Sequence, residues 1–143
     1  PTTKAVHFPI SGGCRFNCYI SIDKKVDGES KQAALTALGA CDFVKHVVVV
    51  DADINIYNEE EVMWAVATRV QADQDVDIIK NVKGNTLDPS QTDDIMTAKM
   101  IIDATRPVQR PFAARVEVPE EALSRVRLED FISRADLERL PKA

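Results

Sequence analysis

Runs of hydrophobic residues recur along the chain, and the spacing within each run predicts its secondary structure. Residues 44–50 end in four consecutive valines without polar alternation, a pattern typical of a strand covered on both faces. Residues 16–22 alternate with a period of two, which predicts a strand with one apolar face and one more polar face. Shorter hydrophobic runs predict further strands at residues 5–8, 75–80 and 99–103.

Two helices are predicted between these strands. An alanine-rich helix is expected over residues 27–38, with Gly39 standing where a left-handed C-terminal cap is expected. Asn58 and Glu61 form an Asn-x-x-Glu capping signature, so a second helix is expected over residues 59–71. Because strands and helices alternate, we expect an α/β fold: a three-layer Rossmann-like sandwich around a mostly parallel or mixed sheet.

The remaining segments are a loop and a tail. Residues 81–98 are dense in Asn, Gly, Thr, Asp, Pro and Ser, which indicates a loop between two strands. Pro119 precedes two glutamates, a sequence typical of a helix start, and residues 128–132 and 136–140 are expected to be short helical segments. This helical tail, residues 119–143, is amphipathic, so we expect it to pack on another domain or subunit.

Length, composition and charge narrow the possible functions. A chain of 143 residues with 45% hydrophobic and 29% charged residues is expected to fold as one α/β domain. The formal net charge of −5 argues against a nucleic-acid partner, and no hydrophobic run approaches the roughly 20 residues of a membrane span. Cys14, Cys18 and Cys41 lack the spacing of a zinc site and are interpreted as reduced, mostly buried thiols of a cytoplasmic protein.

Three polar residues crowd the end of the valine-rich strand, where α/β sheets bind their ligands. Asp51, Asp53 and Asn55 allow three interpretations: a divalent-metal site as in Asp-x-Asp transferases, a calcium loop, or a structural role as acceptors for turn and helix-start amides. The calcium loop fails, because Ile56 and Val62 stand where such a loop needs glycine and glutamate. We favour the structural role, and an interdomain role or metal binding are the alternatives.

Other polar residues near strand ends have simple interpretations. A local ion pair between Asp103 and Arg106 is expected, with anion binding by Arg106 as the alternative. His7 and His46 lie in or beside strands without an acidic partner in sequence, so we interpret both as structural. The chain contains no glycine-rich phosphate loop and no Gly-x-Ser-x-Gly nucleophile motif. The residues taken singly therefore identify no catalytic set.

Three sequence strings together resemble one enzyme family. Residues 44–69 contain Val-Val-Asp-Ala-Asp-Ile, Tyr-Asn-Glu-Glu-Glu-Val and Ala-Thr-Arg; residues 83–90 read Lys-Gly-Asn-Thr-Leu-Asp-Pro-Ser; and residues 99–107 read Lys-Met-Ile-Ile-Asp-Ala-Thr-Arg-Pro. In this order and spacing they resemble the UbiD-type decarboxylases, which use prenylated flavin mononucleotide (FMN). The resemblance covers roughly residues 5–130 and only the C-terminal domain of those enzymes, which favours a fragment of a longer protein.

The resemblance implies where the chemistry of such an enzyme is located. In the family, the catalytic acid–base set, the prenylated FMN site and the Mn2+ ligands lie in the preceding flavin-binding domain. No catalytic, cofactor-binding or metal-ligating residue is therefore expected in this chain. The loop at residues 84–89 is expected to reach over the pocket, with Asn85, Thr86 and Leu87 nearest the substrate. Leu87 would press on an aromatic ring, and Asn85 would meet a ring substituent.

The resemblance thus predicts a pocket-lid and oligomerisation domain of a carboxy-lyase that reversibly decarboxylates aromatic or α,β-unsaturated acids, with a phenolic acid favoured. Its partners would be its own flavin-binding domain and further copies of itself, in a dimer or hexamer. The isolated chain would be inactive. Two alternatives stay open: a non-catalytic dimerisation or interaction module of the same fold, and a fragment of an Asp-x-Asp metal-dependent transferase.

Overall fold

The computed structural model describes residues 2–92, 94–127, 130–133, 136 and 139. The chain divides into two compact units, Pro1–Phe112 and Ala113–Ala143, and each is described by itself. The first unit contains every strand and both long helices of the described residues.

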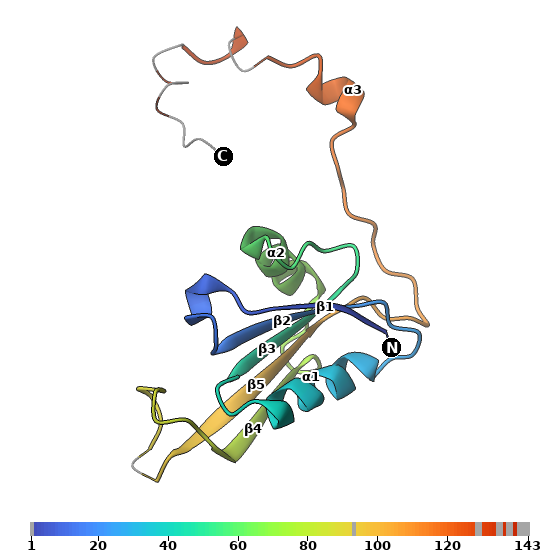
Figure 1. Ribbon diagram of the computed structural model, residues 1–143. Helices are drawn as coiled ribbons and strands as arrows, with labels where there is room; N and C mark the ends of the chain where they lie inside the picture. Colours follow the sequence, from blue (N-terminus) through green and yellow to red (C-terminus); the bar gives the residue numbers. More distant parts are fainter. Residues whose placement is uncertain (1, 93, 128–129, 134–135, 137–138, 140–143) are drawn as a thin grey trace. The chain divides into compact units, whose positions relative to one another are not determined.

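A five-stranded sheet in the order β1-β2-β3-β5-β4 forms the centre of the first unit (Figure 1). Its elements are, in chain order, β1 (Thr3–His7), the 3-10 helix η1 (Ile10–Gly12), β2 (Asn17–Ile22), α1 (Glu29–Ala40), β3 (His46–Asp51), α2 (Glu59–Arg69), β4 (Val76–Lys83) and β5 (Met96–Ala104). The strands β2, β3 and β5 run parallel, whereas β1 and β4 pair antiparallel at the two edges. The predicted mixed sheet is therefore confirmed.

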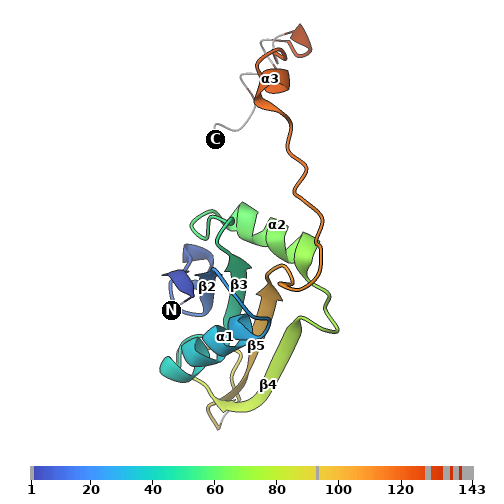
Figure 2. The ribbon, with the colours of Figure 1, turned by 90° about the vertical axis from the view of Figure 1, so that its right-hand side faces the viewer.

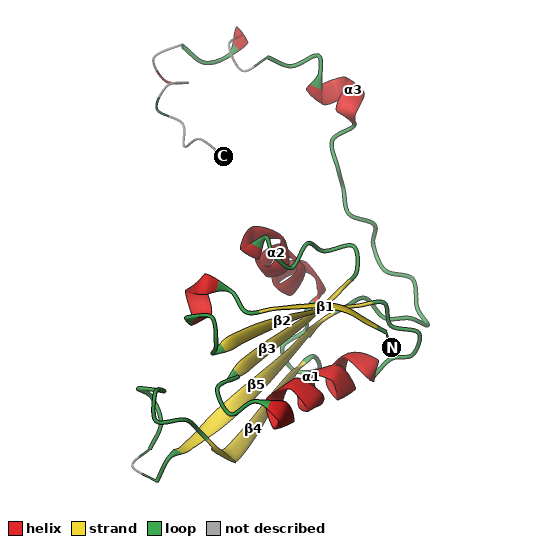
Figure 3. Ribbon diagram, in the orientation of Figure 1, coloured by secondary structure: helices red, strands yellow, loops and turns green. Residues whose placement is uncertain are grey.

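One long helix lies on each face of the sheet, which gives the three predicted layers (Figures 2 and 3). Helix α1 buries Ala34 and Leu38 in one hydrophobic core, and α2 buries Val62 and Ala65 in the other. Successive valines of β3 point alternately into the two cores, because side chains of a strand alternate between its faces. This double burial explains why the valine run contains no polar position.

The predicted end of α1 is wrong. The helix continues through Gly39 to Ala40, and Gly39 does not adopt a left-handed backbone. The carbonyl end of the helix is satisfied instead by a buried lysine of β5. Lys99 Nζ donates to the carbonyl oxygens of Leu38 (3.2 Å) and Cys41 (3.2 Å). A distant ammonium group thus replaces the expected local glycine cap.

Strand β2 and the β4–β5 hairpin also differ from prediction. Both faces of β2 are covered, and Tyr19 and Ser21 of its expected polar face are 4% and 6% exposed. The loop predicted for residues 81–98 is shorter, because β4 extends to Lys83 and β5 begins at Met96. The polar residues at both ends of that segment therefore take part in strand pairing.

The second unit contains the short helix α3 (Glu120–Leu123), which begins directly after Pro119 as predicted. The predicted helical segments 128–132 and 136–140 include residues outside the described part of the chain. No helix among the described residues is long and apolar enough to cross a membrane.

Candidate functional site

The predicted site residues lie at opposite ends of the sheet (Figure 1). Asp51, Asp53 and Arg106 lie at or beyond the carboxyl ends of β3 and β5. The loop of residues 84–95 joins β4 to β5 at the amino ends of the parallel strands. The two groups therefore form two separate candidate sites.

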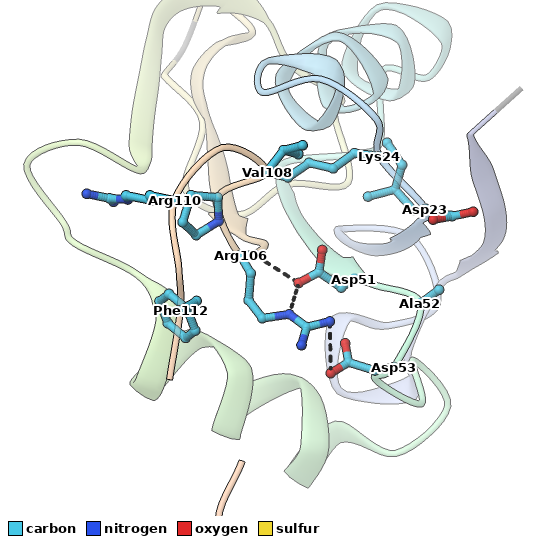
Figure 4. Close-up of a pocket in the computed structure, with 11 residues that line it drawn as sticks. Asp23, Lys24, Asp51, Ala52, Asp53, Arg106, Val108, Arg110 and Phe112 are labelled. Atoms are coloured by element: carbon cyan, nitrogen blue, oxygen red, sulfur yellow. Dashed lines mark hydrogen bonds and ion pairs between the residues drawn. The ribbon is translucent and has the colours of Figure 1, made fainter. Parts of the chain in front are cut away.

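An ion-pair network closes the carboxyl end of the sheet. Arg69, the last residue of α2, donates through Nη1 to Asp51 Oδ2 (2.8 Å) and through Nη2 to Asp53 Oδ2 (2.9 Å). Arg106 donates to the same Asp51 oxygen from its backbone N–H (2.8 Å) and from Nε (3.3 Å) (Figure 4). Its Nη2 also lies 3.5 Å from Asp53 Oδ2. The network thereby joins β3, α2 and the segment after β5.

The electrostatics of this network support a structural role for its carboxylates. Burial acts to raise the pKa of Asp53, but the hydrogen bond and charge of Arg69 and the charge of Arg106 outweigh it, so this pKa lies below its usual range. Guanidinium groups, rather than the expected turn amides, are the main partners of Asp51 and Asp53. Asn55 takes the expected turn role, because its Oδ1 accepts a hydrogen bond from Tyr57 N (3.1 Å).

The same geometry does not fit a metal ion. Both carboxylate oxygens of Asp53 accept hydrogen bonds from Arg69, at 3.2 Å and 2.9 Å. Two guanidinium cations lie against these carboxylates, and their charge would repel a bound cation. Across the described residues, no group of three His, Cys, Asp or Glu side chains is placed to hold a metal. The Asp-x-Asp pair therefore gives no support to the transferase alternative.

The predicted local pair between Asp103 and Arg106 is wrong. Asp103 accepts hydrogen bonds from Thr105 N (3.1 Å) and from Ser30 Oγ, while Arg106 binds Asp51 at the end of β3. Sequence reasoning also missed Arg69, although its place in the Ala-Thr-Arg string was a usable signal.

A cavity of about 400 Å³ opens beside the network (Figure 4). Its charged lining residues are three acids and three bases: Asp23, Asp51, Asp53, Lys24, Arg106 and Arg110. The charges of this lining balance, and the guanidinium group of Arg106 is already bound to carboxylates. The cavity therefore shows no preference for an anion, and the alternative of anion binding by Arg106 finds no support here.

At the opposite end of the sheet, a buried aspartate anchors the loop of residues 84–95. Asp88 is 5% exposed and forms an ion pair with Nζ of Lys45, the residue before β3 (2.8 Å). Asp88 also accepts hydrogen bonds from Ser90 N (3.0 Å) and Thr97 Oγ1 (3.3 Å). Burial acts to raise the pKa of Asp88, but its bonds to Lys45 and Ser90 outweigh this and hold the pKa at about 2.

The three predicted substrate residues lie on this anchored loop. Asn85 is half-buried, and its Oδ1 accepts a hydrogen bond from Leu87 N (3.1 Å). Thr86 and Leu87 are exposed, and the exposed fraction of Leu87 is 56%. Since the turn already uses the side-chain oxygen of Asn85, its Nδ2 amide is the group left for a substrate contact. Polar groups therefore hold this loop in place.

The contacts of both histidines fit a structural role, and one cysteine differs from expectation. His46 Nδ1 lies 3.0 Å from Asn17 Oδ1, and burial lowers the pKa of His46. His7 packs against tyrosine rings. Burial raises the pKa of the Cys18 thiol to about 11, whereas Cys14 is exposed, contrary to the expectation of mostly buried thiols.

One cavity of the described residues does not fit a flavin mononucleotide. An apolar cavity of about 380 Å³ lies between β1, β2 and α1, lined by side chains such as Val6, Phe8 and Ala37. Its lining includes no basic side chain that could bind the flavin phosphate.

Comparisons with known proteins agree on one family. The model of the UbiD_C family, the 3-octaprenyl-4-hydroxybenzoate carboxy-lyase C-terminal domain, matches residues 1–104. The anhydromevalonate phosphate decarboxylase of Methanosarcina mazei is 40% identical over 121 residues, which are 84% of this chain and 29% of that protein. The phenolic acid decarboxylase of Sedimentibacter hydroxybenzoicus is 44% identical over 92 residues, which are 62% of this chain and 19% of that protein.

Solved structures of the UbiD-class enzyme HmfF from Pelotomaculum thermopropionicum show the same fold. One, in complex with FMN, has a TM-score of 0.79 and 48% identity, covering 92% of this chain and 29% of that one. The other, an evolved dimeric form in complex with prFMN, has a TM-score of 0.69 and 42% identity, covering 92% of this chain and 26% of that one. The chain thus spans less than a third of the length of the proteins it matches.

Proposed function

This chain belongs to the 3-octaprenyl-4-hydroxybenzoate carboxy-lyase C-terminal domain family, and from that premise we propose that it is the C-terminal domain of a prenylated-FMN-dependent decarboxylase. The enzyme would act reversibly on aromatic or α,β-unsaturated acids. The loop of residues 84–89 would close one side of the substrate pocket. The preceding domain would hold the acid–base set, the flavin and Mn2+.

The observation that carries this proposal is how the three family strings pair with one another. Asp51 and Arg106, from the first and third strings, bind each other, and Asp88 of the second string binds Lys45 of the first. Leu87 differs, because it is a hydrophobic residue of a family string that remains 56% exposed. Loops on a rigid scaffold commonly carry binding residues. An outward leucine on a tightly bonded turn fits a contact with substrate.

The loop favours a phenolic acid over a phosphorylated one. The names of the relatives include both classes: a phenolic acid decarboxylase and an anhydromevalonate phosphate decarboxylase. Arginine and lysine side chains are the usual strong partners of a phosphate group. Two of the lysines near the loop are already paired, Lys45 with Asp88 (2.8 Å) and Lys83 with Asp42 (2.7 Å). An exposed leucine and one amide donor instead suit a hydroxylated ring.

The proposal also includes assembly into a homo-oligomer, a dimer or a hexamer. The described part of the tail presents exposed hydrophobic side chains, with Val116 96% and Phe131 76% exposed. Exposed hydrophobic residues of this kind suit a surface that another domain or subunit covers. The free cysteines of the described residues fit a reducing compartment, so we place the enzyme in the cytoplasm.

Substitution of Leu87 tests the proposal in the full-length enzyme reconstituted with prenylated FMN and Mn2+. Leu87→Ala should lower kcat/KM for 4-hydroxybenzoate about tenfold, the usual effect of losing hydrophobic contact in a pocket, while flavin absorbance stays unchanged. Leu35→Ala is the matched control, because Leu35 is a 44% exposed leucine on α1. Equal kcat/KM for both variants and the parent would show that the loop does not line the pocket.

A further inference from the structure

The loop that carries Leu87 is held by an ion pair that has no part in the chemistry proposed above. We propose that Lys45 and Asp88 are positioning residues: their buried pair sets where Leu87 and Asn85 stand, and through them which acid the enzyme prefers. This inference rests on the proposed function, because it requires residues 85–87 to meet the substrate.

Lys45 is a rigid support for the pair. Its backbone N–H donates to the carbonyl oxygen of Phe16 (2.8 Å), and its own carbonyl accepts from Met100 N (2.8 Å), so the backbone of Lys45 is bonded on both sides. The side chains of Lys45 and Asp88 are 18% and 6% exposed. Water and salt screen a pair this buried far less than a surface pair, so its geometry is strongly held.

A short path connects Asp88 to the residues that would meet the substrate. Asp88 N donates to the carbonyl oxygen of Asn85 (2.8 Å), and Leu87 N donates to Asn85 Oδ1 (3.1 Å). This is an Asx-type turn, in which a short polar side chain bonds the backbone two residues on. Because Leu87 precedes Asp88 in the chain and both amides bond to Asn85, a shift of Asp88 shifts Leu87.

The rest of the loop is tied to the same anchor. Lys45 Nζ also donates to Ser90 Oγ, and Thr97 Oγ1 of β5 donates to Asp88 Oδ2 (3.3 Å). At the far end of the loop, Ile95 has a φ of 58°, a left-handed conformation that a β-branched residue rarely adopts. Such a backbone persists where surrounding contacts determine it. These contacts hold residues 85–90 against Lys45 and β5, rather than leaving them to follow the substrate.

The test uses the full-length reconstituted enzyme and two substrates, 4-hydroxybenzoate and benzoate. Lys45→Met should change the ratio of their kcat/KM values about tenfold, while flavin absorbance stays unchanged. Lys45→Arg, which keeps the charge, should restore most of the ratio. Lys83→Met is the matched control, because it removes a lysine from an exposed pair with Asp42. If Lys45→Met does not fold, Asp88→Asn, which keeps the side-chain shape, should change the ratio in its place.

Testing Lys45→Met in a variant that already lacks the loop side chains shows whether the pair positions those side chains or only stabilises the fold. When Asn85 and Leu87 are both already alanine, Lys45→Met should leave the substrate ratio unchanged, because the pair acts through these two residues. An equal fall in kcat/KM for both substrates, persisting when Asn85 and Leu87 are both alanine, would show that the pair only stabilises the fold and would overturn the inference. If Leu87→Ala alone changes nothing, the proposed function fails first, and the inference fails with it.

Discussion

Replacement of Arg69 by methionine tests the network at the carboxyl end of the sheet. Methionine keeps much of the apolar stem but removes the guanidinium group that binds both Asp51 and Asp53. The side chains of Arg69 and Asp51 are 2% and 13% exposed, so a carboxylate would stay buried with one cation fewer. Breaking a buried pair on one side typically costs about 3–5 kcal/mol. Because Arg106 stays beside Asp51, we expect a loss of about 2–4 kcal/mol in unfolding free energy.

Two other variants show whether burial sets this magnitude. Asp53→Ala should cost less, about 1 kcal/mol, because Asp53 is 40% exposed and Arg69 keeps its bond to Asp51. Lys83→Met removes a pair of similar length, 2.7 Å, whose side chains are 74% and 52% exposed. Exposed pairs contribute about 0–1 kcal/mol, so this variant should be nearly neutral.

Urea unfolding of the chain in reducing buffer, followed by far-ultraviolet circular dichroism, measures these differences. Tryptophan fluorescence is unsuitable, because the Arg69 guanidinium lies 5.4 Å from the Trp64 ring centroid. The pKa of Asp53 is lowered in the folded state, so its contribution is present above the usual value of 3.8 and is lost as pH falls. As pH falls through that range, the unfolding free energy of Arg69→Met should therefore decrease less than that of the parent protein. An Arg69→Met loss no larger than that of Lys83→Met would refute the reasoning.

Two further predictions concern the activity of the isolated chain and the acid stability that Asp88 provides. The isolated chain, incubated with prenylated FMN, Mn2+ and a panel of aromatic acids, should release no CO2 above buffer; turnover would place the chemistry within this chain. The pKa of Asp88 is held at about 2, so its stabilising contribution is complete above the usual value of 3.8 and disappears as pH falls towards 2. In Asp88→Asn, the unfolding free energy should decrease less over this pH range than in the parent protein. The same pH dependence in both proteins would show that the Lys45 pair does not hold the loop.

Local sequence patterns predicted the elements of the fold better than their ends. The valines of β3 had to be buried on both faces, and helices on both faces bury them. The capping signature before α2 was half correct. Asn58 Oδ1 accepts from Glu60 N (3.0 Å), but Glu61 binds the backbone N–H of Asn55 (3.1 Å) rather than that of Asn58. Residues close in sequence compete for the same few amides, and the local pattern does not decide among them.

Pairings between distant residues could not be predicted in this way. Lys99 satisfies the carbonyl end of α1 from 61 positions away, and Lys45 meets Asp88 across 43 positions. Hydrophobic periodicity reports which face of an element is buried, but it carries no information on which buried charges meet. The error at Gly39 has this cause, since a lysine from another strand removed the need for a glycine cap. The resemblance identified the strings, and only the structure shows that they bind one another.

Ion pairs involving aspartate lie at both ends of the sheet, but they leave different groups available for contacts. At the carboxyl end, where α/β sheets commonly bind their ligands, Arg69 and Arg106 neutralise Asp51 and Asp53 and bind them to the segment after β5. The carboxylates that could bind a ligand are therefore already bound to arginines. At the amino end, an aspartate–lysine pair is buried, and the residue beside the aspartate, Leu87, is turned outward. The carboxylates at the usual ligand edge are already bound to arginines, whereas Leu87 at the other end is exposed, and this is the physical reason for proposing that the loop serves a neighbouring domain's pocket.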